Sequence, residues 1–169
     1  MIILVLGGAR SGKSTVGEAL ASRLPPPVTY VATLLAGTAD ADLAARIHAH
    51  RARRPPAWAT LEAGAELSLV DALRSTTGTV MVDSLGPWVA AAEGLDVDPG
   101  ELCEVLAQRR HDSVLVSEEV GMGVHPSSEV GRRFRDRLGE VNQAVAAIAD
   151  EVLLVVAGRA LRLDPVLGP

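Results

Sequence analysis

Cysteine and long apolar runs are scarce in this sequence. Its 169 residues contain one cysteine, Cys103, which excludes an internal disulfide framework and a cysteine-ligated metal cluster. We expect Cys103 to be a small helix residue. No uninterrupted apolar run approaches the roughly 20 residues of a membrane span, and no basic segment precedes the apolar N-terminus. These absences predict a cytoplasmic protein without membrane insertion or a signal peptide.

The sequence also has no surplus of basic residues and only one lysine. The formal net charge is −5 and the isoelectric point is about 5.3, whereas nucleic-acid-binding domains normally carry excess positive charge. No nucleic-acid partner is therefore expected. Lys13 is the only lysine beside fifteen arginines. Because the sequence otherwise uses arginine as its cation, Lys13 indicates a position that needs a compact ammonium group on a thin, flexible stem.

Short apolar runs alternate with segments of helical spacing. Buried parallel strands are predicted at residues 2–6, 28–32, 79–83, 113–117 and 152–157. Helical spacing joins Val16, Leu20 and Leu24 before a proline run, and a longer helix is predicted from Ser127 to Ile148. Residues 161–163 predict a last short edge strand. The pattern favours one α/β domain over residues 1–169, with a P-loop NTPase-like three-layer fold and a mostly parallel sheet.

The strongest motif follows the first predicted strand. Residues 7–14 read GGARSGKS and match the G-x-x-x-x-G-K-[ST] pattern of a phosphate-binding loop through Gly7, Gly12, Lys13 and Ser14. Backbone N–H groups of such a loop surround a phosphate at a helix N-terminus. Lys13 is predicted to hold the β- and γ-phosphate oxygens and Ser14 to ligate Mg²⁺. A glycine-rich turn without ligand is the alternative.

A carboxylate ends the predicted strand at 79–83. Asp83 stands where a Walker B acid reaches the metal site from the carboxyl edge of a sheet. Aspartate also ends many strands simply as a turn residue. Together with the phosphate-binding loop, Asp83 becomes the predicted acid on the metal side.

Arginine and histidine crowd into residues 46–54. His48 and His50 are two positions apart, about 200° on a helix, so they cannot chelate one metal together from there. Either could be a nucleophile or base while Arg51, Arg53 and Arg54 bind phosphate oxygens. A solvated helix face with surface histidines remains the other interpretation.

These motifs together resemble one family. The loop at 7–14, the HRARRP segment at 50–55 and EVGMGVHP at 119–126 occur in the order found in bifunctional adenosylcobinamide kinase / adenosylcobinamide-phosphate guanylyltransferases. Further similarity at Tyr30–Thr33, Trp58–Glu62, Phe134–Asp136 and 149–158 extends the resemblance over nearly the whole chain.

The resemblance implies two reactions. A nucleoside triphosphate, ATP or GTP, would phosphorylate adenosylcobinamide, and GMP would then pass from GTP to adenosylcobinamide phosphate through a GMP-histidine intermediate, with Mg²⁺ present. The family pattern places the histidine at His50, which with Lys13 forms the implied catalytic pair, and it implies a homotrimer. The implied nucleotide-binding residues are Gly7, Gly8, Ala9, Arg10, Ser11, Gly12, Lys13, Ser14, Thr33, Leu34, Leu35, Arg51, Ala52, Arg53, Arg54, Glu62 and Asp83, with Ser14 and Asp83 at the metal.

Three positions depart from the family pattern. Glu118 stands where members often have asparagine, Asp83 replaces what is sometimes glutamate, and residues 94–110 look shortened. The role of the Glu118–Glu119 pair stays open, as do cobinamide contacts in the shortened region. Two other functions also stay open: a P-loop small-molecule kinase without nucleotidyl transfer, and a GTP-switched binding protein.

Overall fold

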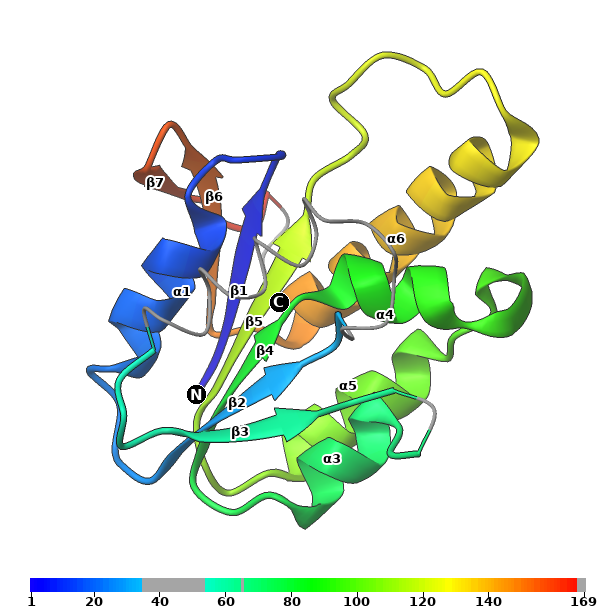
Figure 1. The fold of residues 1–169 in the computed structure, drawn as a ribbon. Helices are drawn as coiled ribbons and strands as arrows, with labels where there is room; N and C mark the ends of the chain where they lie inside the picture. Colours follow the sequence, from blue (N-terminus) through cyan, green and yellow to red (C-terminus); the bar gives the residue numbers. More distant parts are fainter. Residues whose placement is uncertain (35–53, 65, 167–169) are drawn as a thin grey trace.

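One sheet carries all the strands of the computed structural model, which describes residues 1–34, 54–64 and 66–166 (Figure 1). The strand order is β3-β2-β4-β5-β1-β6-β7, and every neighbouring pair is parallel except β6 and β7. The strands are β1 (Ile2–Gly7), β2 (Val28–Ala32), β3 (Ala59–Glu62), β4 (Thr79–Asp83), β5 (Ser113–Glu118), β6 (Glu151–Val156) and β7 (Arg159–Arg162).

Helices cover both faces of this sheet. They are α1 (Lys13–Ala21), α3 (Leu69–Ser75), α4 (Leu85–Ala91), the short 3-10 helix η1 (Glu93–Leu95), α5 (Pro99–Gln108) and α6 (Glu129–Ile148). Figure 1 shows α1 on one side of the sheet and α3, α4, α5 and α6 on the other. Among the described residues, no helix is long and apolar enough to span a membrane.

Alternating side chains of the strands build two separate cores. Ile3 and Val5 of β1 belong to the core on the α1 side, whereas Leu4 and Leu6 belong to the core under the other helices. This is the period of two that a strand imposes. Both faces are apolar, as expected for a parallel sheet covered by helices. The predicted three-layer α/β fold with a mostly parallel sheet is confirmed.

Most predicted element positions agree with the structure. The strands at 28–32 and 79–83 are as predicted, β1 and β5 are one residue longer, β6 begins and ends one residue earlier, and β7 covers 159–162 instead of 161–163. Cys103 lies in α5, as expected. Helix α6 begins after Ser128, whose side chain accepts a hydrogen bond from Gly131 N at its first turn.

Helix α1 is shorter than predicted. It ends at Ala21, so the prediction that helical spacing continues to Leu24 was wrong. The Ser22 hydroxyl donates to the Glu18 carbonyl at 2.8 Å, which satisfies one of the last carbonyls of the helix. Leu24 nevertheless packs against the same core as Val16 and Leu20. Its apolar character was therefore a signal of burial and not of helix.

The position of β5 determines what the sheet brings together. It lies between β1, which leads into the phosphate-binding loop, and β4, which ends at Asp83. The carboxyl ends of these parallel strands meet at one edge of the sheet. The residue that ends β5, Glu118, therefore lies between the loop and Asp83.

Candidate active site

The loop between β1 and α1, residues 7–14, has the geometry of a phosphate cradle. Gly12 is the N-cap of α1 and has φ of 94°, a left-handed conformation that residues with a side chain rarely adopt. The loop closes on itself through Ser11 N, which donates to Gly8 O at 3.3 Å. Gly158, in the turn after β6, braces the loop by donating its N–H to Ser11 O at 2.7 Å.

Ser14 and Asp83, the two residues predicted to ligate Mg²⁺, contact each other. The Ser14 hydroxyl donates to Asp83 Oδ1 at 3.1 Å, across 69 positions of the chain. A hydroxyl and a carboxylate at the mouth of a phosphate-binding loop are the hard oxygen ligands that Mg²⁺ prefers, with phosphates and waters completing the shell. The two side chains therefore fit a Mg²⁺ ion at this position.

Tyr30 and Arg54 extend this contact toward β3. The Tyr30 hydroxyl, buried on β2, donates to Asp83 Oδ2 at 2.6 Å. The Arg54 guanidinium lies 3.4 Å from the centre of the Tyr30 ring, in a cation–π stack. Burial and the charge of Asp83 raise the pKa of Tyr30 far above its ordinary range, so its hydroxyl stays protonated and can donate.

Lys13 faces the carboxylate of Glu118. Its Nζ lies 3.5 Å from Glu118 Oε1 and 3.4 Å from the Gly8 carbonyl oxygen. The lysine side chain is only 12% exposed and that of Glu118 26%, so water screens the pair less than a surface ion pair. The predicted phosphate-binding lysine thus points into the cradle.

Glu118 is also held by the start of α4, through the N-cap residue Ser84 and through Gly86. Its Oε1 accepts a hydrogen bond from Ser84 Oγ at 2.7 Å, and its Oε2 accepts one from Gly86 N at 2.9 Å. A Cβ on Gly86 would lie 2.2 Å from Glu118 Oε2, so only glycine allows this approach. Glu118 therefore joins the phosphate cradle to the beginning of α4.

Thr33 and Leu34 follow β2 at the same edge of the sheet. Thr33 is buried, and its hydroxyl donates to Ser84 O at 2.5 Å and accepts from Ser84 N at 2.9 Å. These two bonds tie the end of β2 to the N-cap of α4. Leu34 is the last described residue of this segment and is partly exposed.

Arg54 and Glu62 line a hollow beside β3. Its other lining residues are Pro55, Pro56, Trp58 and Thr60. Arg54 Nη1 donates to Thr60 Oγ1 at 3.3 Å across this hollow. An arginine, a carboxylate and a tryptophan around one depression can hold a polar, planar group by hydrogen bonds and stacking. The structure thus brings two predicted nucleotide-binding residues together near Tyr30.

Several predicted site residues lie outside the described part of the chain. They are Leu35, His48, His50, Arg51, Ala52 and Arg53. Gly7 is buried at the end of β1, whereas Gly8, Ala9 and Arg10 are exposed at the tip of the loop.

Sequence reasoning gave no role to Tyr30, Ser84 or Glu118, which all contact the site. Tyr30 and Glu118 are polar residues on otherwise apolar strands, but only the strand order shows that these strands lie beside Asp83 and the phosphate loop. Ser84 had no signal in the sequence beyond its place after Asp83. The register that aligns Ala32 with Asp83, and Asp83 with Val116, decides these contacts.

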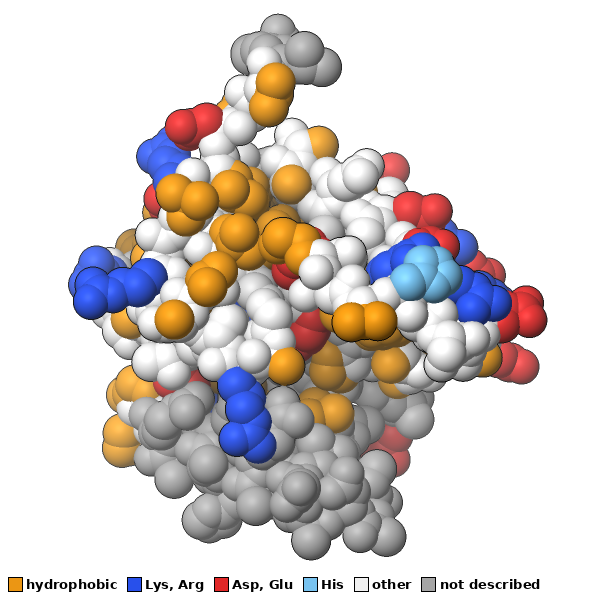
Figure 2. All heavy atoms as spheres, turned by 90° about the horizontal axis from the view of Figure 1, so that it is seen from above, with side chains coloured by type: hydrophobic (Ala, Val, Ile, Leu, Met, Phe, Trp, Pro, Cys, Tyr) orange, Lys and Arg blue, Asp and Glu red, His pale blue; other side chains and the backbone are white. Residues whose placement is uncertain are grey.

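The surface around the site is partly apolar. Figure 2 looks onto the edge at which the parallel strands end and shows hydrophobic side chains gathered on part of this face. Exposed large hydrophobic residues that follow β5 and end β6 include Met122, Val124 and Val156. A substrate with an extended apolar body would find contact area there.

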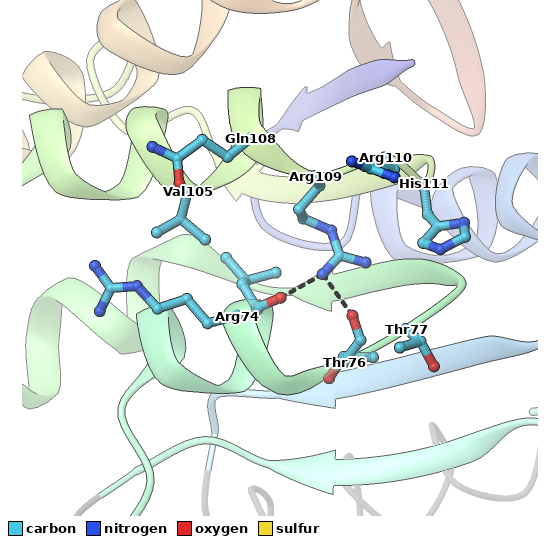
Figure 3. A pocket seen from close by; sticks show the side chains of 9 residues that line it. Arg74, Thr76, Thr77, Val105, Gln108, Arg109, Arg110 and His111 are labelled. Carbon is cyan, nitrogen blue, oxygen red and sulfur yellow. Dashed lines mark hydrogen bonds between the residues drawn. The ribbon is translucent and has the colours of Figure 1, made fainter.

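A second hollow lies at the other end of the sheet, before β4 and β5 begin. Arg109 dominates it, because its Nη1 donates to the Leu73 and Thr76 carbonyls (Figure 3). Its Nη2 donates to the Gly78 carbonyl at 2.7 Å. Burial lowers the pKa of Arg109 from its ordinary value. These bonds tie α5 to the end of α3, which is a structural role.

The chain matches known proteins over almost its whole length. The family described as cobinamide kinase / cobinamide phosphate guanyltransferase matches residues 3–163. The bifunctional adenosylcobalamin biosynthesis protein CobP of Pseudomonas aeruginosa is 40% identical over 164 residues, 92% of each chain. CobU of Salmonella typhimurium, with the same description, is 39% identical over 183 residues, 96% of this chain and 99% of that protein.

Solved structures share the fold with lower identity. An ATPase from the type III secretion system of pathogenic bacteria has a TM-score of 0.57 at 13% identity, over 90% of this chain and 50% of its own. The VirB11 ATPase of Brucella suis has a TM-score of 0.52 at 14% identity, over 96% of this chain and 47% of its own. The chain thus spans about half the length of these ATPases, which share its P-loop fold. The family match, the sequence identity and the phosphate cradle agree: this chain belongs to the cobinamide kinase / cobinamide phosphate guanyltransferase family.

Proposed function

We propose that this enzyme catalyses two successive reactions of adenosylcobalamin biosynthesis. It phosphorylates a hydroxyl of adenosylcobinamide with a nucleoside triphosphate, and it then transfers GMP from GTP to the phosphate formed, releasing pyrophosphate. The observation that carries the proposal is the 3.1 Å contact between Ser14 and Asp83 at the phosphate cradle. It forms the metal-side half of a triphosphate site in a chain of this family.

In the phosphorylation, the chain positions the triphosphate and spreads its charge. Backbone N–H groups of the cradle and the start of α1 face the phosphates, and Lys13 Nζ reaches their oxygens. Ser14 and Asp83 would hold a Mg²⁺ ion, which neutralises charge on the phosphates when bound. Tyr30 fixes the second oxygen of Asp83 at 2.6 Å, so that the carboxylate keeps one orientation. Positioning and electrostatics of this kind supply most of the catalysis in phosphoryl transfer.

In the nucleotidyl transfer, we assign the nucleophile to His50. A neutral imidazole nitrogen attacks the α-phosphorus of GTP, a P–N bond forms, and the bond from that phosphorus to the bridging oxygen breaks, so that pyrophosphate leaves. The phosphate of adenosylcobinamide phosphate then attacks the same phosphorus and displaces the imidazole. Arginines 51, 53 and 54 would stabilise the charge on the phosphoryl oxygens. Arg54 lines the hollow shared with Glu62, and this supports a nucleotide there.

Product analysis with adenosylcobinamide tests the proposal. We expect adenosylcobinamide phosphate with ATP or GTP and Mg²⁺, and adenosylcobinamide-GDP plus pyrophosphate only when GTP is present. Phosphate without any GDP product would reduce the enzyme to a kinase. Equal rates of AMP and GMP transfer would contradict guanine specificity, and failure to turn over either nucleotide would favour a binding protein. We also propose a homotrimer, which light scattering of the purified chain would check.

A further inference from the structure

Glu118 carries an inference beyond the two reactions. We propose that Glu118 is a positioning residue for Lys13: its carboxylate holds the ammonium group inside the empty phosphate cradle and shares it with the phosphates once a triphosphate binds. The proposal rests on the proposed use of the cradle for triphosphate binding. Neither the motif nor the family resemblance assigns this role, since Glu118 stands where members often have asparagine.

The first observation is that Glu118 is itself held in place. Ser84 Oγ and Gly86 N each donate to one of its oxygens, at 2.7 and 2.9 Å. Its backbone carbonyl accepts from Asn142 Nδ2 at 3.1 Å, and buried Asn142 also accepts from Ser117 Oγ at 2.6 Å. The start of α4 therefore holds the carboxylate, and α6 holds the backbone of the residue that carries it. A group fixed in this way can orient a flexible partner.

The second observation is that Lys13 is confined although its side chain is flexible. Lysine has a long stem with high conformational freedom, yet Lys13 Nζ lies 3.5 Å from Glu118 Oε1 and its side chain is 12% exposed. Lys13 Nζ also donates to the Gly8 carbonyl oxygen at 3.4 Å, which belongs to the cradle. The carboxylate thus keeps the ammonium group where phosphate oxygens must arrive.

The same geometry has an opposing effect on binding. A carboxylate within 3.5 Å of the phosphate-binding ammonium also repels incoming phosphates. Removal of its charge should therefore strengthen triphosphate binding while it loosens Lys13, and a misplaced catalytic group commonly slows chemistry by one or two orders of magnitude. A positioning role consequently predicts that KM and kcat fall together, whereas mere loss of structure would raise KM.

Glu118→Gln is the appropriate substitution. Glutamine has the same shape, and its carbonyl oxygen can still accept a hydrogen bond from Gly86 N or Ser84 Oγ. The charge is lost, and one of the two acceptor oxygens becomes an NH2 donor. Glu140→Gln is the matched control, because it makes the same charge change on α6, where Glu140 pairs with Arg137 at 2.8 Å. Glu118→Asn, which places the residue often found in the family, is a second variant if the first fails to fold.

The only lysine provides a direct spectroscopic readout. In protein labelled with isotopes at lysine alone, NMR relaxation of the single ε-methylene group measures the mobility of Lys13. We expect higher mobility in free Glu118→Gln than in the wild type or Glu140→Gln, with a non-hydrolysable GTP analogue and Mg²⁺ restoring order. In the kinase reaction we expect KM for the triphosphate to fall severalfold and kcat to fall about tenfold.

The outcomes separate the two proposals. If the mobility of Lys13 in the wild type does not change when the GTP analogue is added, the cradle does not bind triphosphates. That result would overturn both the proposed function of the cradle and the role of Glu118. A wild-type signal that responds, combined with unchanged mobility and unchanged KM and kcat in both Glu118 variants, would overturn only the role of Glu118. A raised KM with a lower melting temperature would show that Glu118 is merely structural.

Discussion

Tyr30 and Asp83 are joined by a 2.6 Å hydrogen bond inside the core, although 53 positions separate them in the chain. The phenol occupies one oxygen of the carboxylate and Ser14 the other, at 3.1 Å. Asp83 is thus oriented on both sides before any ligand arrives. Such preorganisation reduces the rearrangement that metal and triphosphate binding require.

Because Tyr30 is the only tyrosine, its hydrogen bond to Asp83 can be tested by a titration with alkali. Burial and Asp83 raise the pKa of Tyr30, so the folded protein keeps its phenolic proton above about pH 10, where an unfolded tyrosine loses it. The contribution of Tyr30 to stability is therefore present below about pH 10 and is lost as the pH rises further. We expect the ultraviolet signal of phenolate to appear only when the protein unfolds in alkali. Tyr30→Phe should remove the signal, and a phenolate signal from folded protein near pH 10 would contradict the burial.

Replacement of Lys13 should abolish phosphorylation without unfolding the chain. Loss of a group that stabilises transferring phosphate costs about two orders of magnitude or more in rate. We expect Lys13→Ala, and largely Lys13→Arg, to lack triphosphate-dependent phosphorylation while circular dichroism melts stay close to the wild type.

Because Lys13 is the only lysine, an amine-acylating reagent offers a second measurement. Mass spectrometry should find modification at Lys13 and the N-terminus only, with saturating GTP and Mg²⁺ protecting Lys13. Unchanged labelling of Lys13 in the presence of GTP would refute its place in the phosphate cradle.

His50 should carry the nucleotide label. Incubation with Mg²⁺ and GTP radiolabelled at the α-phosphate, without cobinamide, should leave label on the protein through an acid-labile, base-stable bond. Protonation of the ring makes imidazole a good leaving group, whereas a phosphoserine ester survives acid.

His48→Ala is the matched control for this experiment. His50→Ala should lose the label and GMP transfer but keep some kinase activity, because that step needs the cradle and not the histidine. His48→Ala should keep both activities. If His48→Ala loses the label and His50→Ala keeps it, the nucleophile is His48 and not His50. If both variants keep the label, the proposed histidine mechanism is wrong.

Arg109 should matter for stability alone. Its guanidinium donates to carbonyls of Leu73, Thr76 and Gly78, far from the cradle. Arg109→Ala would leave these carbonyls without their donor, at a cost of roughly 2–4 kcal/mol, or a melting temperature lower by about 5–15 °C. Exposed Arg110→Ala should change the melt little. KM for the triphosphate, measured below the melting range, should not move; a large increase would mean that this hollow is coupled to the site.

Residues that act through a local pattern were predictable from the sequence. The phosphate cradle needs its residues at fixed spacing, and a buried strand is apolar along its length, so residues 7–14 and Asp83 could be placed in advance. Edge strand β3 was not predicted, because Ala59–Glu62 is short and mostly exposed. Helices α3 and α4 have seven residues each, about two turns, which is too short for an apolar period to be recognised. Of α5, only Cys103 was predicted to be helical.

Contacts made by register could not be predicted. Glu118 reaches Lys13, Ser84 and Gly86 because β5 pairs with both β1 and β4. No local pattern states which strands are neighbours. For the same reason the contact of Tyr30 with Asp83 could not be predicted. Without the pairing of β2 with β4, Tyr30 is indistinguishable from an ordinary core residue.

The position of β1 also dictates the order in which the chain can fold. Its two neighbours are β5, which begins at Ser113, and β6, which begins at Glu151, and the turn after β6 braces Ser11 through Gly158. On the ribosome, the N-terminal strand emerges first but must wait for most of the chain before either neighbour exists. Long-range pairing of this kind is slow. A chain that stops before residue 151 therefore lacks both β6 and the Gly158 brace of the phosphate cradle.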